Sequence, residues 1–121
     1  MYEANTVSKE ILDALPTPKG FRMLVAMPEV KEKTAGGIML PDDLKKREET
    51  ASIIGQVLSM GDDCYADPAR FPSGPWCKEG DWVLMRSSSG TRFKVKGREF
   101  RILNDDTIEA VVLDPKGFER A

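Results

Sequence analysis

The sequence predicts a single all-β domain, because most of its apolar residues fall in short runs bounded by turn formers. With 121 residues the chain is long enough for one modest core but not for two. Glycine, serine, asparagine and aspartate separate the runs, a pattern typical of short strands in a barrel or sandwich.

A short helix is expected before the first strand. Apolar residues recur at helical spacing in Val7–Leu15, with Thr6 or Ser8 available as a cap and Pro16 as the stop. We expect no more than a helical turn packed on the domain, within an N-terminal extension of residues 1–15.

From Phe21 the apolar period changes to two. Phe21, Met23, Val25 and Met27 share one face of a predicted strand that Pro28 ends. The same criteria give five later strand candidates: Ser52–Met60, Asp81–Arg86, Thr91–Lys96, Glu99–Leu103 and Thr107–Leu113.

The hairpin around Lys96-Gly97-Arg98 is the clearest local prediction. Phe93 and Val95 alternate with basic residues before this turn, and a second strand candidate follows it.

Two long segments do not fit the strand pattern. Residues 28–50 carry many charges and few groups that could bury their backbone, which indicates mobility. Residues 61–80 hold three prolines and three aromatics, which indicates a stiffer projection. Loops of this length in a small domain are usually functional or disordered.

Three large apolar residues, Ile38-Met39-Leu40, follow the Gly36-Gly37 pair inside the first long segment. Charges flank them on both sides, including Lys45–Glu49, which we interpret as a solvated segment. We interpret the triplet as an apolar hook offered to another protein. From the residues alone, an ordinary strand at a barrel edge is an equally good interpretation.

Charge and cysteine usage limit the function classes. The chain has 18 Lys+Arg against 20 Asp+Glu, so there is no electrostatic reason to expect nucleic acid or an anionic membrane. There is no secretion signal and no apolar run of membrane-spanning length. Two cysteines without such a signal suggest a reduced, cytoplasmic protein.

The sequence contains no histidine. A Ser-His-Asp or Cys-His arrangement and a His-ligated metal site are therefore excluded, and two cysteines are too few for a Cys-only zinc site. We predict no catalytic residue, no metal and no cofactor. The serines Ser87-Ser88-Ser89 before Gly90 are interpreted as a polar turn.

The second long segment contains both cysteines and an aromatic group. We expect Tyr65, Phe71 and Trp76 to form a small satellite cluster beneath the loop. Cys64 and Cys77 are interpreted as unpaired thiols, with a disulfide as the alternative if they flank the base of a hairpin.

Five motifs in a fixed order carry a family resemblance. They are Lys33–Pro41, Gly55–Gly61, Glu79–Leu84, Gly97–Leu103 and Asp106–Val112. Each alone is weak, but the ordered set resembles the GroES family of co-chaperonins over roughly Pro16–Leu113. Its T-A-G-G-I-x-L-P core is the most specific part.

The resemblance implies an irregular GroES-like β-barrel over 16–113, with a mobile loop at about 31–48 and a roof hairpin at 61–80. A C-terminal tail, 114–121, follows it. The family partners are an ATP-driven chaperonin ring, six further copies in a seven-membered ring, and an unfolded client; ATP is bound by the chaperonin. The implied chaperonin-binding residues are Gly36, Gly37, Ile38, Met39 and Leu40.

Strand pairing between neighbouring protomers is also implied, by the first and last strands. The residues at matching positions are Arg22, Met23, Leu24, Val25, Ala26 and Met27 in the first strand, and Ile108, Glu109, Ala110, Val111, Val112 and Leu113 in the last.

A single hook is expected to bind weakly. Burial of the three apolar side chains gives about 5–8 kcal/mol, whereas ordering a released loop costs on the order of 1–2 kcal/mol for each residue fixed. Several hooks on one ring make later contacts intramolecular, so avidity rises by orders of magnitude.

The chain departs from the bacterial pattern in its N-terminal extension and its proline-rich roof segment. It also has Ser88-Ser89-Gly90 where many members carry Gly-Tyr-Gly on the cavity wall. These changes resemble the divergent co-chaperonins of bacteriophages, which fold a large capsid protein, and they suggest a roomier cavity.

Two other protein classes share features with this sequence. GroES-like barrels also form the catalytic domain of alcohol dehydrogenases and quinone reductases, but this chain lacks a nucleotide-binding domain and its Gly-x-Gly-x-x-Gly signature. The stronger alternative is a non-enzymatic structural or assembly β-barrel that uses the same loop for another partner.

Overall fold

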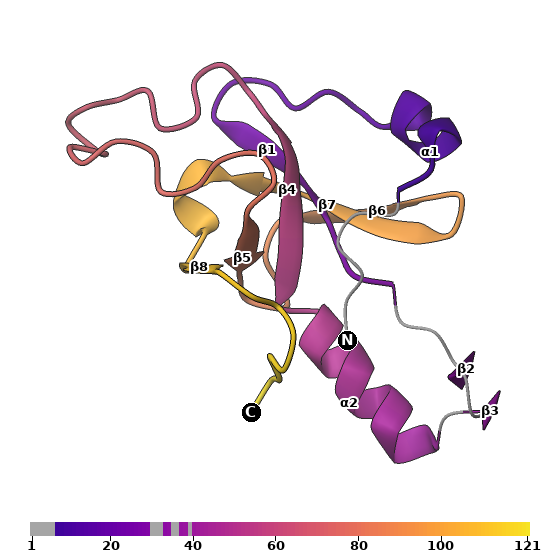
Figure 1. Ribbon diagram of the computed structural model, residues 1–121. Helices are drawn as coiled ribbons and strands as arrows, with labels where there is room; N and C mark the ends of the chain where they lie inside the picture. Colours follow the sequence, from indigo (N-terminus) through magenta and orange to yellow (C-terminus); the bar gives the residue numbers. More distant parts are fainter. Residues whose placement is uncertain (1–6, 30–32, 35–36, 39) are drawn as a thin grey trace.

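A six-stranded antiparallel sheet forms the body of the computed structural model, which describes residues 7–29, 33–34, 37–38 and 40–121 (Figure 1). Its strand order is β6-β7-β1-β4-β5-β8. The strands are β1 (Arg22–Ala26), β4 (Ile54–Met60), β5 (Trp82–Leu84), β6 (Thr91–Val95), β7 (Arg98–Asn104) and β8 (Ala110–Val112). The predicted all-β domain is therefore confirmed.

Shorter elements surround the sheet. They are the helices α1 (Lys9–Ala14) and α2 (Pro41–Ala51), the 3-10 turn η1 (Asp105–Thr107) and a separate two-stranded pair of β2 (Lys33–Thr34) with β3 (Gly37–Ile38). Among the described strands no pairing joins β6 to β8, so these two strands end the sheet within the protomer.

β1 lies inside the sheet, and its side chains contribute to two hydrophobic cores. Successive side chains of a strand point to opposite faces. Met23, Val25 and Met27 pack in the larger core, while Leu24 and Ala26 pack in a smaller one. All five are at most 3% exposed. Phe21, expected on the same face as Met23, lies before the strand and is 40% exposed.

The N-terminal helix forms as predicted. The Ser8 hydroxyl accepts a hydrogen bond from the Ile11 backbone N–H, which satisfies one of the free donors of the first turn. Val7, Ile11 and Leu15 pack against the smaller core. α1 therefore covers one face of the sheet; residues 1–6 of the predicted extension lie outside the described part of the chain.

The predicted hairpin joins β6 and β7 in register Thr91↔Ile102 to Val95↔Arg98. Lys96 and Gly97 form its two-residue turn with φ of 49° and 83°. Positive φ at both central positions is the type I′ geometry that matches strand twist, which explains a glycine here.

The serine run forms a turn between β5 and β6, also as predicted. The Ser89 N–H donates to the Arg86 carbonyl at 3.0 Å. Arg101, fully buried on β7, donates through Nη1 to the carbonyls of Arg86 and Ser89 at 3.3 and 3.5 Å. Its Nε lies 3.2 Å from Glu99 Oε2, so a buried guanidinium fixes the turn from inside.

The segment 61–80 connects the paired strands β4 and β5 and contains turns but no strand of its own. Figure 1 shows it extending away from the sheet. Backbone bonds from Gly80 N–H to the Val57 carbonyl, 2.8 Å, and from Val57 N–H to the Asp81 carbonyl, 2.9 Å, close its base. Residues 61–80 therefore form a projecting loop at the end of the β4–β5 hairpin.

Replacing Gly90 with alanine should destabilise the fold more than the same change at Gly97. Gly90 has φ +76°, and a Cβ there would lie 2.5 Å from the Ile102 carbonyl oxygen and from Leu103 Cδ2. We expect the free energy of unfolding in urea to fall by about 2–4 kcal/mol. At Gly97, with φ +83° and no heavy atom within 4 Å of the added Cβ, the loss should be about 1 kcal/mol. Equal losses would contradict the close approach at Gly90.

Candidate functional site

The apolar triplet lies at the beginning of a helix that the sequence analysis missed. α2 starts with Leu40 as its N-cap and with Pro41 in the first turn, where the missing N–H of proline costs nothing. Asp42 and Asp43 follow in the first turn, next to the positive end of the helix dipole. They also stand four residues before Lys46 and Arg47, a spacing that favours ion pairs along a helix.

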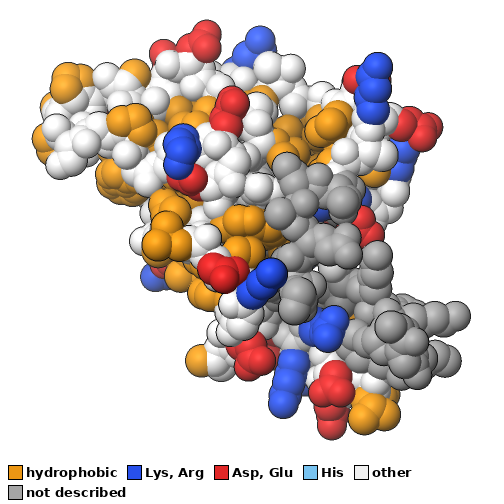
Figure 2. All heavy atoms as spheres, in the orientation of Figure 1, with side chains coloured by type: hydrophobic (Ala, Val, Ile, Leu, Met, Phe, Trp, Pro, Cys, Tyr) orange, Lys and Arg blue, Asp and Glu red, His pale blue; other side chains and the backbone are white. Residues whose placement is uncertain are grey.

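α2 projects from the body like an arm. Of its residues only Thr50 and Ala51, at the last turn, are buried. Figure 1 shows the other end pointing away from the sheet, and Figure 2 shows charged side chains on the same part of the molecule. Eleven residues span about 16 Å. The prediction that Lys45–Glu49 is solvated is confirmed, although the segment is helical.

The far end of the arm presents an apolar side chain. Leu40 is 69% exposed. Just before it, β2 and β3 pair in register Lys33↔Ile38 and Thr34↔Gly37. Gly36 and Met39, two of the predicted binding residues, lie outside the described residues. The described part of the site is therefore a short strand pair, an exposed leucine and the helix behind it.

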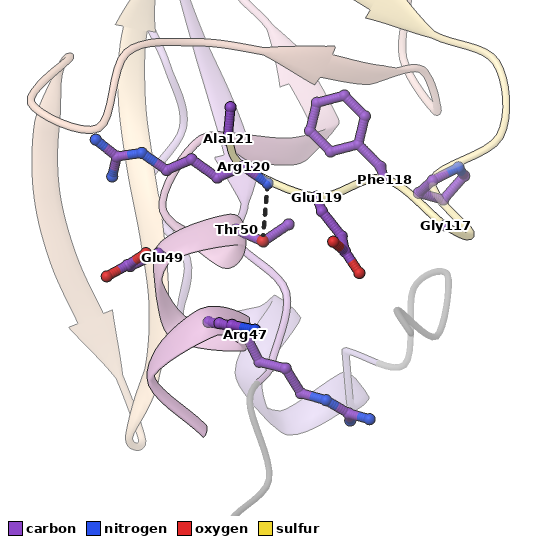
Figure 3. A pocket seen from close by; sticks show the side chains of 10 residues that line it. Arg47, Glu49, Thr50, Gly117, Phe118, Glu119, Arg120 and Ala121 are labelled. Atoms are coloured by element: carbon purple, nitrogen blue, oxygen red, sulfur yellow. Dashed lines mark hydrogen bonds between the residues drawn. The ribbon is translucent and has the colours of Figure 1, made fainter. Parts of the chain in front are cut away.

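The root of the arm contacts the C-terminal tail. The Arg120 N–H donates to Thr50 Oγ1 at 3.0 Å, and Arg120 Nη1 lies 3.4 Å from Ser52 Oγ. Figure 3 shows this contact beside Phe118. A cavity of about 380 Å³ remains between tail and helix, lined by residues of both. The sequence analysis assigned the tail no role.

Two strands, the first and the last, were predicted to join protomers, and they differ in whether a backbone edge is left unpaired. All residues of β1 are paired with β7, and Met23 to Ala26 are also paired with β4. The side chains Met23–Met27 are buried within the protomer. The prediction that Arg22–Met27 pairs with a neighbouring copy is therefore corrected, because no backbone edge remains.

β8 is different, because it ends the sheet. It pairs with β5 through Val83↔Val111, and no described strand pairs with its other edge. Val111 is 38% exposed and Leu113 96% exposed. Ile108, by contrast, is buried in the larger core. An open edge with exposed apolar side chains is available to another chain.

The aromatic group of the projecting loop is confirmed as a cluster, but it is no satellite. Tyr65 and Phe71 meet edge to face at 4.9 Å between ring centroids, and both belong to the larger core. Trp76 lies 5.1 Å from Phe71 and is 46% exposed. Figure 2 shows apolar side chains at this end of the molecule.

Both cysteines are free thiols. Cys77 is buried and its Sγ lies 3.4 Å from the Tyr65 hydroxyl, while Cys64 Sγ contacts the Arg22 carbonyl at 3.2 Å. Burial raises the pKa of Cys64 to about 11 in spite of a hydrogen bond from Gly61. Burial also raises the pKa of Cys77. Neither thiol is therefore activated as a nucleophile near neutral pH.

Within the described residues there is no group of three or more acidic or cysteine side chains placed to hold a metal ion. In the same part of the chain, no helix is long and apolar enough to cross a membrane.

Comparison with known proteins decides the family. The model of the chaperonin 10 kDa subunit family matches residues 17–112. The chain belongs to this family. The resemblance found in the sequence and the GroES-like fold class are thereby confirmed.

Three relatives illustrate the match, each described as co-chaperonin GroES. The protein of Bacillus subtilis strain 168 is 33% identical over 99 residues, which cover 78% of this chain and 96% of the relative. That of Rubrobacter xylanophilus is 38% identical over 95 residues, covering 78% and 93%. That of Dinoroseobacter shibae is 36% identical over 98 residues, covering 81% and 90%. These names describe co-chaperonins and not enzymes.

The raised pKa of Cys64 predicts a loss of stability in alkali. The thiol titrates at its ordinary value of 9.0 when unfolded and at about 11 when folded. Between these values the unfolded state loses its proton first, so stability is complete below pH 9 and falls as pH rises toward 11. Urea unfolding at pH 8 and pH 10.5 should show a smaller fall for Cys64→Ala than for the original chain. An identical pH dependence would mean that Cys64 is not shielded from water.

Proposed function

We propose that the protein is a co-chaperonin that caps an ATP-driven chaperonin ring through Ile38, Met39 and Leu40. The observation that carries this proposal is the 69% exposure of Leu40 at the tip of an otherwise charged helix. The family match supports it, because relatives that cover this chain over most of their length are named as co-chaperonins. ATP is bound by the chaperonin, so the protein itself needs no cofactor.

The helix α2 lowers the entropy cost of binding through the apolar triplet. Residues 41–51 are already ordered, so their backbone entropy is not lost when the tip binds. Burial of one leucine still gives only about 1.5–3 kcal/mol. A single arm therefore binds weakly and reversibly, and firm capping requires several arms on one assembly.

The open edge of β8 is available for the protomer contacts of the seven-membered ring that the family resemblance implies. Its free backbone groups and the exposed Val111 and Leu113 can be covered by the next protomer. Such a ring presents seven arms toward one partner and encloses space for an unfolded client.

The small residues Ser88-Ser89-Gly90 support a roomy chamber wall and a large client such as a viral capsid protein. Together with the N-terminal extension, they favour a bacteriophage-encoded co-chaperonin that works in the host cytoplasm. The alternative function is a structural or assembly β-barrel protein that uses the same loop, with its exposed Leu40, for another partner.

Leu40→Asp should abolish ATP-dependent capture by a chaperonin, because a charged side chain at the tip cannot enter an apolar groove. Leu12→Asp is the matched control, since Leu12 is also exposed but lies on α1. The measurement is co-elution with a GroEL-type ring in the presence of ATP. If Leu40→Asp is captured as well as the original chain, the proposal that the tip of α2 contacts the chaperonin is wrong. Lack of capture of the original chain would favour the assembly protein.

The ring predicts a mass of about seven times the 13.5 kDa chain in light scattering. Val111→Asp should shift the protein to monomers, because seven carboxylates would be brought to the interfaces. Thr91→Asp, exposed on β6 at the opposite end of the sheet, is the control. A monomeric original chain would contradict the ring, and dissociation by Thr91→Asp alone would move the interface to β6.

A further inference from the structure

The C-terminal tail contains a hydrogen-bonded turn. The Phe118 N–H donates to the Pro115 carbonyl at 3.2 Å, with Gly117 at φ +78° between them. This is the position at which a tight turn of type II requires glycine. Asp114 Oδ1 accepts the Lys116 N–H at 2.9 Å. The chain is therefore turned back toward α2 after β8.

The tail contacts the C-terminal end of α2, where the helix joins the sheet. Thr50, 4% exposed, accepts the Arg120 backbone N–H through its hydroxyl. Its neighbour Ser52 is the C-cap of α2 and lies 3.4 Å from the Arg120 guanidinium. In Figure 3 the tail passes directly over the last turn of the helix, with Phe118 beside it.

Arg120 supplies a positive charge at the C-terminal end of α2. The last turn of α2 contains no basic residue, and Glu48 and Glu49 stand near the negative end of its dipole. A guanidinium at the C-cap compensates for that unfavourable arrangement. The backbone bond to Thr50 holds it there.

α2 depends on such support. An isolated helix of eleven residues is marginal in water. Its buried residues are confined to the last turn, Thr50 and Ala51, while most of its other side chains are exposed. A cavity of about 380 Å³ lies beside the contact, lined by residues of the tail and of α2.

We propose that the tail, residues 114–121, is a clamp that keeps α2 folded and so holds the tip of the arm in position. The tail lies beyond the family match at 17–112. The clamp is thus a property of this chain in addition to the family fold. Its effect on chaperonin capture rests on the proposed function, whereas its effect on α2 does not.

Trypsin cleavage of the free protein tests the clamp directly. Lys45, Lys46 and Arg47 lie within α2, and a folded helix resists cleavage. A chain ending at Asp114 should be cut there at least fivefold faster, with an intermediate rate for Thr50→Val, which removes the hydroxyl acceptor. Thr50→Ser keeps the acceptor and should match the original chain. All chains that keep the tail are compared with Lys116→Ala in place, because exposed Lys116 is itself a trypsin site within the tail and does not line the cavity.

Unchanged cleavage in the shortened chain, with its thermal unfolding also unchanged, would overturn the clamp. So would equal acceleration in Thr50→Val and Thr50→Ser, because the hydroxyl acceptor would then be irrelevant.

Capture by a chaperonin ring with ATP measures the consequence. The shortened chain should bind at least tenfold more weakly, because the released arm must be ordered again on binding. Equal binding together with faster cleavage would restrict the clamp to the free protein and contradict its role in holding the tip. If the original chain is not captured at all, the proposed function fails, while the cleavage result still decides whether the tail clamps α2.

Discussion

Leu40 is 69% exposed at the far end of a charged helix. The proposed binding to a chaperonin depends on this exposure. Burial of such a side chain is favourable only when another surface covers it. Because the gain is a few kcal/mol at most, one arm makes a reversible contact. In the proposed function the arm thus needs a base, which the sheet provides, and neighbouring copies, for whose contacts the edge of β8 is available.

Local patterns predicted those parts of the chain whose structure is decided locally. Ser8 and Pro16 bounded α1 correctly, and the alternation around Phe93 gave the β6–β7 hairpin. α2 escaped prediction because it lies in water and so carries no apolar stripe, the main sequence signal of a helix. Pro41 followed by Asp42 and Asp43, ahead of strong helix formers, was the signal that could have revealed it.

Predictions that depended on long-range placement were weaker. The first strand in sequence was expected at a protomer interface, yet β1 lies between β7 and β4. Sequence order does not give sheet order. The continuous apolar run Met23–Met27 was the signal for a strand buried on both faces, because Leu24 and Ala26 fill a second core. The tail contact with Thr50 joins residues 70 apart, and no pattern within either segment indicates it.

The most direct measurement is the NMR signal of a ¹³C-methyl-labelled Leu40, recorded for the free protein and after addition of a chaperonin ring with ATP. A side chain held in water should give a solvent-exposed methyl signal in the free protein that broadens on capture, while the exposed Leu12 on α1 stays unchanged. A Leu40 signal that is already shielded from solvent in the free protein, or that is unaffected by capture, would contradict the central claim.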